Sequence, residues 1–154
     1  MLKRQIFQVS KTIWCVRQPS YLTCSYGIIT PDGVVLVDAG MDSTGSDVRE
    51  LLFKMGRSEQ DLRAILITHW HNDHAAGAQI TAIRSGCPVY YHQAEEPWLT
   101  RKTARNDFRN NIAQIIPEWG IGILIIGLVG DAIPRAVQAS QFLKHGDKVH
   151  GIEV

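Results

Sequence analysis

The chain lacks the features that mark several large classes of protein. It carries almost no net charge, with 16 basic and 15 acidic residues among 154. The basic field that nucleic-acid-binding proteins use is therefore missing, and we expect neither a nucleic-acid partner nor a membrane partner. The three cysteines include no CxxC pair. This argues against a disulfide framework and favours a reducing, cytoplasmic location.

Long apolar segments are also scarce. The first residues contain no apolar core of the secretory type. One apolar run, residues 121–130, has about half of the ~20 residues that a membrane-spanning helix requires. We interpret it as a buried helix or the wall of an apolar pocket, with a shallow membrane contact as the alternative. A hydrophobic content of 45% supplies material for one core, and we treat residues 1–154 as a single domain.

The spacing of apolar residues predicts a layered α/β or α+β domain. Strands are expected at residues 6–16, 21–30, 34–37, 64–68 and 87–91, with a further strand or hairpin at 147–154. Helices are expected after the potential capping residues 42–44 as far as Gly56, at 75–85, and over much of 93–119. The segment 34–37 is apolar throughout, which predicts a strand buried on both faces.

The most informative segment follows the expected strand at 64–68. Four metal-ligand side chains fall within six positions there: His69, His71, Asp73 and His74. Ligand sites of open α/β sheets lie beyond the carboxyl ends of strands. In an extended chain His69 and His71 point the same way and can share one ion, whereas Asp73 and His74 can diverge toward a second. Imidazole and carboxylate donors suit zinc, with iron or manganese possible.

This spacing predicts hydrolysis at two metal ions. Two ions would bridge a water and lower its pKa, and the resulting hydroxide would attack a carbonyl. Asp73 is expected to orient the hydroxide or to pass its proton to the leaving group. Asp38, at the end of the neighbouring strand, is a candidate for orienting an imidazole from behind the ligands, the alternative being a turn residue at a helix entry. Trp70 is expected to face either a substrate pocket or the core beneath the metal loop.

Two segments carry a resemblance to a known family. The run from Thr68 to Gly77, with the strand and turn from Val34 to Gly40, resembles the metallo-β-lactamase superfamily. The resemblance covers most of the chain from Trp14 onward. It implies an αββα sandwich with a dinuclear centre. By this resemblance the first metal ion is bound by His69 and His71, and the second by Asp73 and His74.

The chain also departs from the family pattern. Members normally supply further ligands from a Gly-His-Thr-like loop and later positions, and no Gly-His-Thr occurs here. The last residues resemble the strand that leads into that loop. We therefore expect a sandwich that is incomplete at its C-terminus, truncated before the second group of ligands. Each ion would have two protein ligands, where catalytic zinc typically has three, so we expect weak metal binding by this chain alone.

The resemblance implies a metal-dependent hydrolase of a small molecule with a thioester, lactone, or other ester or amide carbonyl. A cytoplasmic thioester or lactone hydrolase similar to glyoxalase II is the leading interpretation. A di-iron oxidoreductase of the superfamily is disfavoured because the histidines are retained, and a nuclease is disfavoured by the balanced charge. A half-domain without a complete site, and hence without activity, is the remaining alternative. The other histidines are expected at the surface, with His150 the one to test as a substitute ligand.

Overall fold

The computed structural model describes residues 4–18, 23–100 and 136–154. The apolar run 121–130 and most of the helical stretch expected at 93–119 lie outside the described residues.

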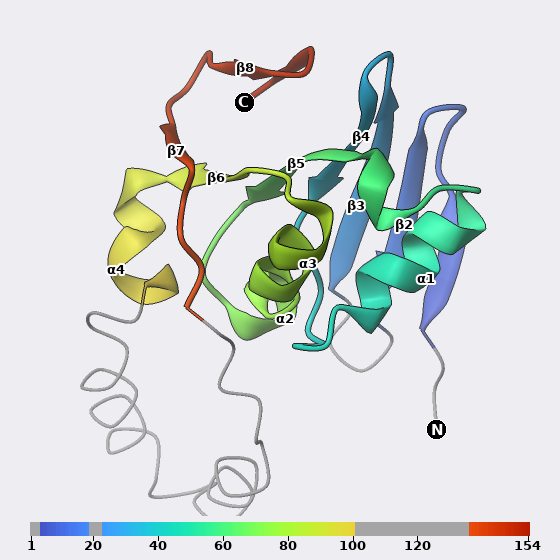
Figure 1. Cartoon of the computed structure of the whole chain (residues 1–154), viewed down its shortest axis with the longest axis horizontal. Coiled ribbons are helices and arrows are strands. Elements are labelled where there is room, and N and C mark those ends of the chain that lie inside the picture. The colour runs from blue at the N-terminus through green and yellow to red at the C-terminus, as the bar shows by residue number, and fades with distance from the viewer. Residues whose placement is uncertain (1–3, 19–22, 101–135) are drawn as a thin grey trace, which may run out of the picture.

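The described part begins with four strands, continues with alternating helices and strands, and ends with three short strands, as Figure 1 shows. The strands are β1 (Gln5–Gln8), β2 (Ile13–Arg17), β3 (Cys24–Thr30), β4 (Gly33–Val37), β5 (Leu62–Ile67), β6 (Val89–His92), β7 (Gln141–Leu143), β8 (Lys148–Val149) and β9 (Ile152–Glu153). The α-helices are α1 (Ser46–Lys54), α2 (Asn72–Ala75), α3 (Ala78–Ser85) and α4 (Glu96–Leu99), and two short 3-10 helices are η1 (Glu59–Asp61) and η2 (Gln93–Glu95).

Seven strands form one mixed sheet in chain order from β1 to β7. Strands β1 to β4 are antiparallel neighbours, whereas β4 to β7 are parallel to one another. The parallel strands are joined through helices, as parallel pairs require. The register of β4 and β5 sets Val37 opposite Leu66, so that the residues following these two strands leave the same edge of the sheet. The predicted α/β class is confirmed.

The two faces of the sheet are covered by different elements. On one face the core joins strand residues such as Leu36 and Ile65 to Leu51 of α1 and Ala78 of α3. On the other face a smaller cluster joins strand residues to the hairpin β8–β9, which contributes Val149. Because side chains alternate along a strand, β4 supplies both clusters. Val34, Val35 and Leu36 are all fully buried, which confirms the prediction for this strand.

The prediction of one continuous strand at residues 6–16 is wrong, because the chain reverses direction between β1 and β2. The Ser10 hydroxyl accepts the backbone N–H groups of Thr12 and Ile13 at 3.3 and 3.2 Å. A serine turn of this kind carries no glycine or proline signal. The two halves pair as an antiparallel hairpin at the edge of the sheet.

The helix expected at 75–85 is divided into α2 and α3 at Gly77. A side chain at Gly77 would place its Cβ 2.3 Å from the carbonyl oxygen of Ala39, so the backbone between the two helices lies directly on the loop that follows β4. The Ala39 N–H donates to the carbonyl of His74 at 2.7 Å and holds the same contact. The close approach requires glycine and attaches α2 to the end of β4.

The boundaries of α1 are partly as expected. The helix ends at Lys54 and is followed by Gly56 in the left-handed conformation, as predicted. Residues 42–44 do not cap the helix through a side chain, because Gly45 occupies the N-cap position. Asp42 instead accepts hydrogen bonds from the Thr44 N–H and the Ser46 hydroxyl. Among the described helices none is long and apolar enough to cross a bilayer.

Candidate metal centre

The four predicted ligands leave the sheet together at the end of β5. The strand ends at Ile67, and the next residues form a short connection into α2, with His71 as the residue before the helix. The carbonyl of His71 accepts the N–H groups of His74 and Ala75 at 3.0 Å each, which closes the first turn. One strand end and one helical turn therefore carry the whole set, as the sequence predicted.

Asp38 joins the neighbouring strand end to this connection. Its backbone N–H donates to the carbonyl of Leu66 at 2.8 Å, and its carboxylate accepts the Thr68 N–H at 2.9 Å. The Thr68 hydroxyl lies 3.0 and 2.9 Å from the two carboxylate oxygens. The residue is buried and has a left-handed backbone, with φ of 58°. Hydrogen bonds from the β5 end thus hold a conformation that non-glycine residues seldom adopt.

The same carboxylate orients two imidazole rings. Asp38 Oδ2 lies 2.8 Å from Nδ1 of His74, and the Thr68 hydroxyl lies 2.9 Å from Nδ1 of His69. A carboxylate only accepts, so Nδ1 of His74 carries the hydrogen. The Thr68 hydroxyl gives its single hydrogen to Asp38 and therefore accepts from Nδ1 of His69. In the neutral form of each ring the lone pair is then on Nε2, the nitrogen left for a metal ion.

The rings form a compact group. The ring centroid of His69 lies 4.1 Å from that of His74 and 4.8 Å from that of His71. Burial lowers the pKa of His69, and the neighbouring His74 and His71 lower it further, because each charged ring disfavours another. His69 is therefore neutral at pH 7, the state in which an imidazole binds a metal ion.

Three imidazoles and one carboxylate lie close to one another here, and these donor types suit divalent metal ions. Asp73 turns toward His74, with its Oδ2 3.7 Å from Nε2. Within the described ranges, no three His, Cys, Asp or Glu side chains are arranged to hold one ion. The predicted division, His69 with His71 and Asp73 with His74, accordingly stays a prediction.

Trp70 lies at the surface beside these rings. Its side chain is 37% exposed, and its ring centroid is 4.4 Å from that of His71. The backbone N–H of Trp70 donates to the carboxylate of Glu95 at 2.9 Å, and this hydrogen bond joins the connection after β5 to η2. The indole stacks on Trp98 of α4, with centroids 5.0 Å apart and planes inclined by 19°. The alternative that placed Trp70 in the core is wrong.

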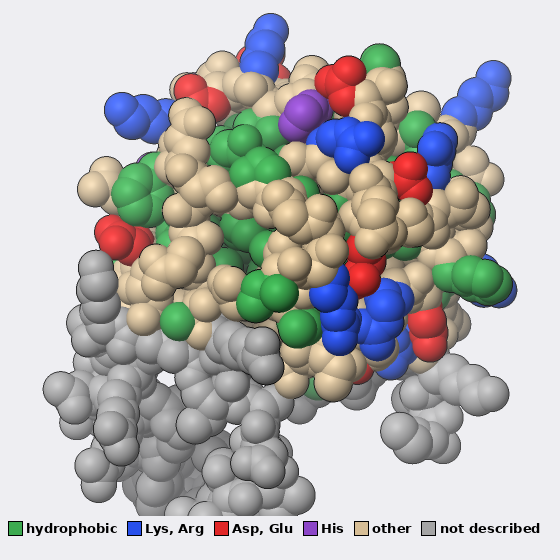
Figure 2. Space-filling view, in the orientation of Figure 1, with side chains coloured by type: hydrophobic (Ala, Val, Ile, Leu, Met, Phe, Trp, Pro, Cys, Tyr) green, Lys and Arg blue, Asp and Glu red, His purple; other side chains and the backbone are tan. Residues whose placement is uncertain are grey.

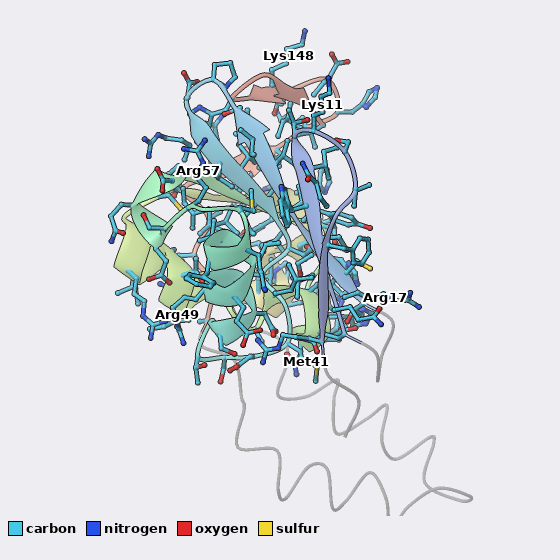
Figure 3. All side chains as sticks on the ribbon, turned by 90° about the vertical axis from the view of Figure 1, so that its right-hand side faces the viewer. Lys11, Arg17, Met41, Arg49, Arg57 and Lys148 are labelled. Carbon is cyan, nitrogen blue, oxygen red and sulfur yellow. The ribbon has the colours of Figure 1, made fainter. Side chains whose placement is uncertain are left out.

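The remaining histidines lie apart from this cluster. His150 Nδ1 is 3.2 Å from the carboxylate of Asp32, which precedes β4, whereas Asp38 follows the same strand. Figure 3 shows this separation, because Met41 in the loop after β4 lies at one end of the molecule and Lys148 of β8 at the other. His145 is exposed, and His92 is exposed with Nδ1 accepting the Ala94 N–H. The structure therefore gives no support to His150 as a substitute ligand.

Sequence reasoning did not find the contacts that three residues make at this site. Thr68 was part of the quoted motif, but its position between Asp38 and His69 depends on the pairing of β4 with β5. Glu95 and Trp98 carry no local signal for their contacts with Trp70, because both contacts join segments about 25 residues apart. A hydroxyl directly after a buried strand and before a ligand histidine is the one signal that was available.

Comparison with known proteins gives a family match and several relatives. The family model of the metallo-beta-lactamase superfamily matches residues 21–146. A probable metallo-hydrolase, YflN of Bacillus subtilis, is 37% identical over 93 residues, which cover 56% of this chain and 35% of YflN. The exodeoxyribonuclease WalJ of Streptococcus pneumoniae is 35% identical over 81 residues, which cover 53% of this chain and 29% of WalJ.

Solved structures show the same fold. The subclass B3 metallo-beta-lactamase BJP-1 of Bradyrhizobium japonicum superposes with a TM-score of 0.65 at 22% identity, covering 94% of this chain and 47% of that chain. The chain thus spans about a third of the two curated relatives and about half of this enzyme.

Proposed function

Because the chain belongs to the metallo-beta-lactamase superfamily, we propose that it carries the first group of metal ligands of a metal-dependent hydrolase. The proposed substrates are small molecules with a thioester, lactone, or other ester or amide carbonyl. The proposed ions are zinc, which imidazole and carboxylate donors suit, with iron or manganese as the alternatives. The activity of the whole protein is part of this proposal, since the relatives are longer than the matched segment.

One observation carries the proposal. A single buried carboxylate, Asp38, accepts from the ring of His74 and, through Thr68, orients the ring of His69. Partial burial and the neighbouring rings of His74 and His71 disfavour the charged form of His69, so the group favours neutral imidazoles. The arrangement is favourable if the free Nε2 atoms bind a cation.

The residues divide the work of hydrolysis between them. Metal ions at this site would lower the pKa of water toward neutrality and polarise the carbonyl oxygen. Asp38 and Thr68 keep the two rings in the tautomer with Nε2 free. Asp73 Oδ2 lies 3.7 Å from Nε2 of His74, within the cluster, and this supports the proposal that its carboxylate would accept a proton from the attacking water and return it to the leaving group.

A phosphodiesterase is the second candidate, favoured by the identity of 35% with WalJ. Charge gives it less support, because the formal net charge of the chain is +1. On the face drawn in Figure 2, Lys and Arg side chains are interspersed with Asp and Glu. Such a surface attracts a polyanion weakly.

The test uses the full chain with Zn²⁺, Mn²⁺ or Fe²⁺ supplied in excess, because two protein ligands for each ion are expected to bind it weakly. The substrates are an acetyl thioester, a γ-lactone, p-nitrophenyl acetate and bis(p-nitrophenyl) phosphate. We expect turnover of a carbonyl substrate that is lost on chelation and falls at least about 100-fold in His71→Ala, while His145→Ala, an exposed histidine outside the cluster, retains it. Faster turnover of the phosphodiester supports the second candidate. Metal binding without turnover of any substrate contradicts both and supports the inactive half-domain.

A further inference from the structure

The two stacked indoles lie directly beside the candidate metal centre. Trp70 follows His69 and precedes His71, so its position in the chain is tied to the ligands themselves. Its ring centroid is 4.4 Å from that of His71 and 5.0 Å from that of Trp98. With 37% of its surface exposed, Trp70 presents aromatic surface to solvent next to the proposed reaction site.

Backbone hydrogen bonds anchor the two segments that carry these indoles. The Glu95 carboxylate accepts the Trp70 N–H at 2.9 Å and fixes the backbone on which this ring is carried. Trp98 is followed by Leu99, which is buried in the main core and whose carbonyl accepts the Val137 N–H at 2.9 Å. A rigid aromatic surface binds a flat ring with little loss of conformational entropy.

Charge around the pair selects among flat ligands. Glu95 lies in the turn before Trp98, where its carboxylate accepts the backbone N–H of Trp70, and Asp73 lies in the adjoining cluster. A phosphate backbone passing over the indoles would meet these carboxylates, and like charges at such a site are unfavourable. A neutral ring joined to a carbonyl meets no such penalty. Aromatic rings attract one another at centroid separations of about 4.5–7 Å. If the ring of a ligand contacts Trp70 at such a separation, a short linker suffices to bring the carbonyl of the same ligand beside His71.

We propose that Trp70 and Trp98 form the subsite for a planar aromatic group on the acyl side of the substrate. The proposal rests on the proposed hydrolase function and narrows its substrates to small arylalkanoyl thioesters, lactones or esters. In the reaction the oxygen of water bonds to the acyl carbon, and the bond from that carbon to the sulfur or oxygen of the leaving group breaks. The leaving group takes up a proton from the water and departs as a thiol or alcohol, or in a lactone stays attached as a hydroxyl, while the aromatic group stays bound to the indoles. The product retained by the subsite is therefore an arylalkanoic acid.

The first measurement compares two thioesters with the same leaving group, one phenylacetyl and one acetyl, on the metal-loaded full chain. We expect kcat/KM to favour the phenylacetyl substrate. Trp98→Ala and Trp70→Ala should reduce this preference by about 3- to 10-fold, mainly through KM, which is the range that one aromatic contact provides. Trp70→Phe should restore most of it. Phe53→Ala on α1, which removes an aromatic ring that is 78% exposed, is the matched control and should leave the preference unchanged.

A second measurement does not depend on turnover. Phenylacetate is titrated into the full chain and its Kd is measured by ligand-observed NMR, with cyclohexylacetate as the non-aromatic comparison. We expect tighter binding of phenylacetate, weakened by Trp98→Ala and unaffected by Phe53→Ala.

The outcomes separate the subsite from the hydrolase. Hydrolysis of both thioesters with a preference that Trp98→Ala leaves unchanged overturns the subsite and leaves the proposed function standing. Phenylacetate binding that depends on Trp98, with no thioester hydrolysed, supports the subsite and counts against the proposed function. Binding of a short single-stranded DNA that depends on Trp98, without binding of phenylacetate, overturns the assignment to small aromatic acids.

Discussion

Replacing Asp38 with asparagine removes the carboxylate that links the ends of β4 and β5 while keeping the shape of the side chain. Asparagine tolerates the left-handed backbone found here, with φ of 58°, so the substitution adds no conformational strain. The amide oxygen can still accept the Thr68 N–H. The amide nitrogen, however, must take the place of Oδ2, which lies 2.8 Å from Nδ1 of His74. Two N–H donors would then face one another.

The expected cost follows from these contacts. A hydrogen bond to a charged group contributes about 1.5–3 kcal/mol, and Asp38→Asn loses the charged partner of His74 and of the Thr68 hydroxyl. The His74 ring can relieve the clash by moving its hydrogen to Nε2, which recovers one bond. That tautomer has no lone pair on Nε2, so the change restores part of the stability but does not restore metal binding. We expect the free energy of unfolding of the metal-free chain to fall by about 1.5–3 kcal/mol and metal affinity by about 10- to 100-fold.

The assay pairs two measurements on one variant. Urea unfolding in the presence of a chelator gives the stability change, and competition with a chromophoric chelator gives zinc affinity. Asp32→Asn is the matched control, because Asp32 also faces a histidine but its side chain is 63% exposed, against 4% for Asp38. Exposed pairs contribute little, so the control should match the unaltered chain. Equal stability and equal zinc affinity in Asp38→Asn and Asp32→Asn would refute the role assigned to Asp38.

Two further predictions concern the same end of the sheet. Gly77→Ala sets a Cβ 2.3 Å from the Ala39 oxygen, and we expect the free energy of unfolding, measured in urea, to fall by about 1–3 kcal/mol. Ile83→Ala, at an exposed position of α3, is the control. Equal unfolding midpoints for the two variants would contradict the close contact. The pKa of His69 lies below the ordinary 6.5 through burial and the neighbouring rings, so the native state binds fewer protons than the unfolded chain. Its contribution to stability is present above about pH 6.5 and is lost as the pH falls toward the lowered pKa. His69→Gln should flatten the pH dependence of unfolding between about pH 7 and pH 5 in chelator, and an unchanged slope would contradict this.

Local sequence signals predicted the elements that hold the site. The apolar run 34–37, the turn at Asp38 to Gly40 and the amphipathic pattern ending at Gly56 correspond to β4, the loop after it and α1. The same holds for β5 and the ligand run that follows it. Each of these depends on residues close together in the chain, where apolar spacing and turn residues act directly.

Features that depend on distant partners were missed. Strand β7 has three residues and exists because Gln141 to Leu143 pair with β6, about 50 residues earlier. The break at Gly77 is caused by the close approach of the loop after β4. The hydroxyl of Thr68 has its role only because β4 and β5 are neighbours. None of these partners is visible within a window of sequence.

The strand register connects the fold to the proposed chemistry. With Val37 opposite Leu66, the first residues beyond each strand are Asp38 and Thr68, so their contact follows from the pairing itself. That contact sets the tautomers of two rings before a metal ion binds, and His69 has already lost its proton at neutral pH. Metal binding at His69 and His74 would then require no change of tautomer. In the proposed site Asp73 would still have to reorient, because its Oδ2 lies 3.7 Å from Nε2 of His74, the nitrogen proposed to bind the ion. Zinc affinity should accordingly depend more steeply on Asp38 than its distance from the ion suggests, because the cost of ordering two ligands is met by the folding of the sheet.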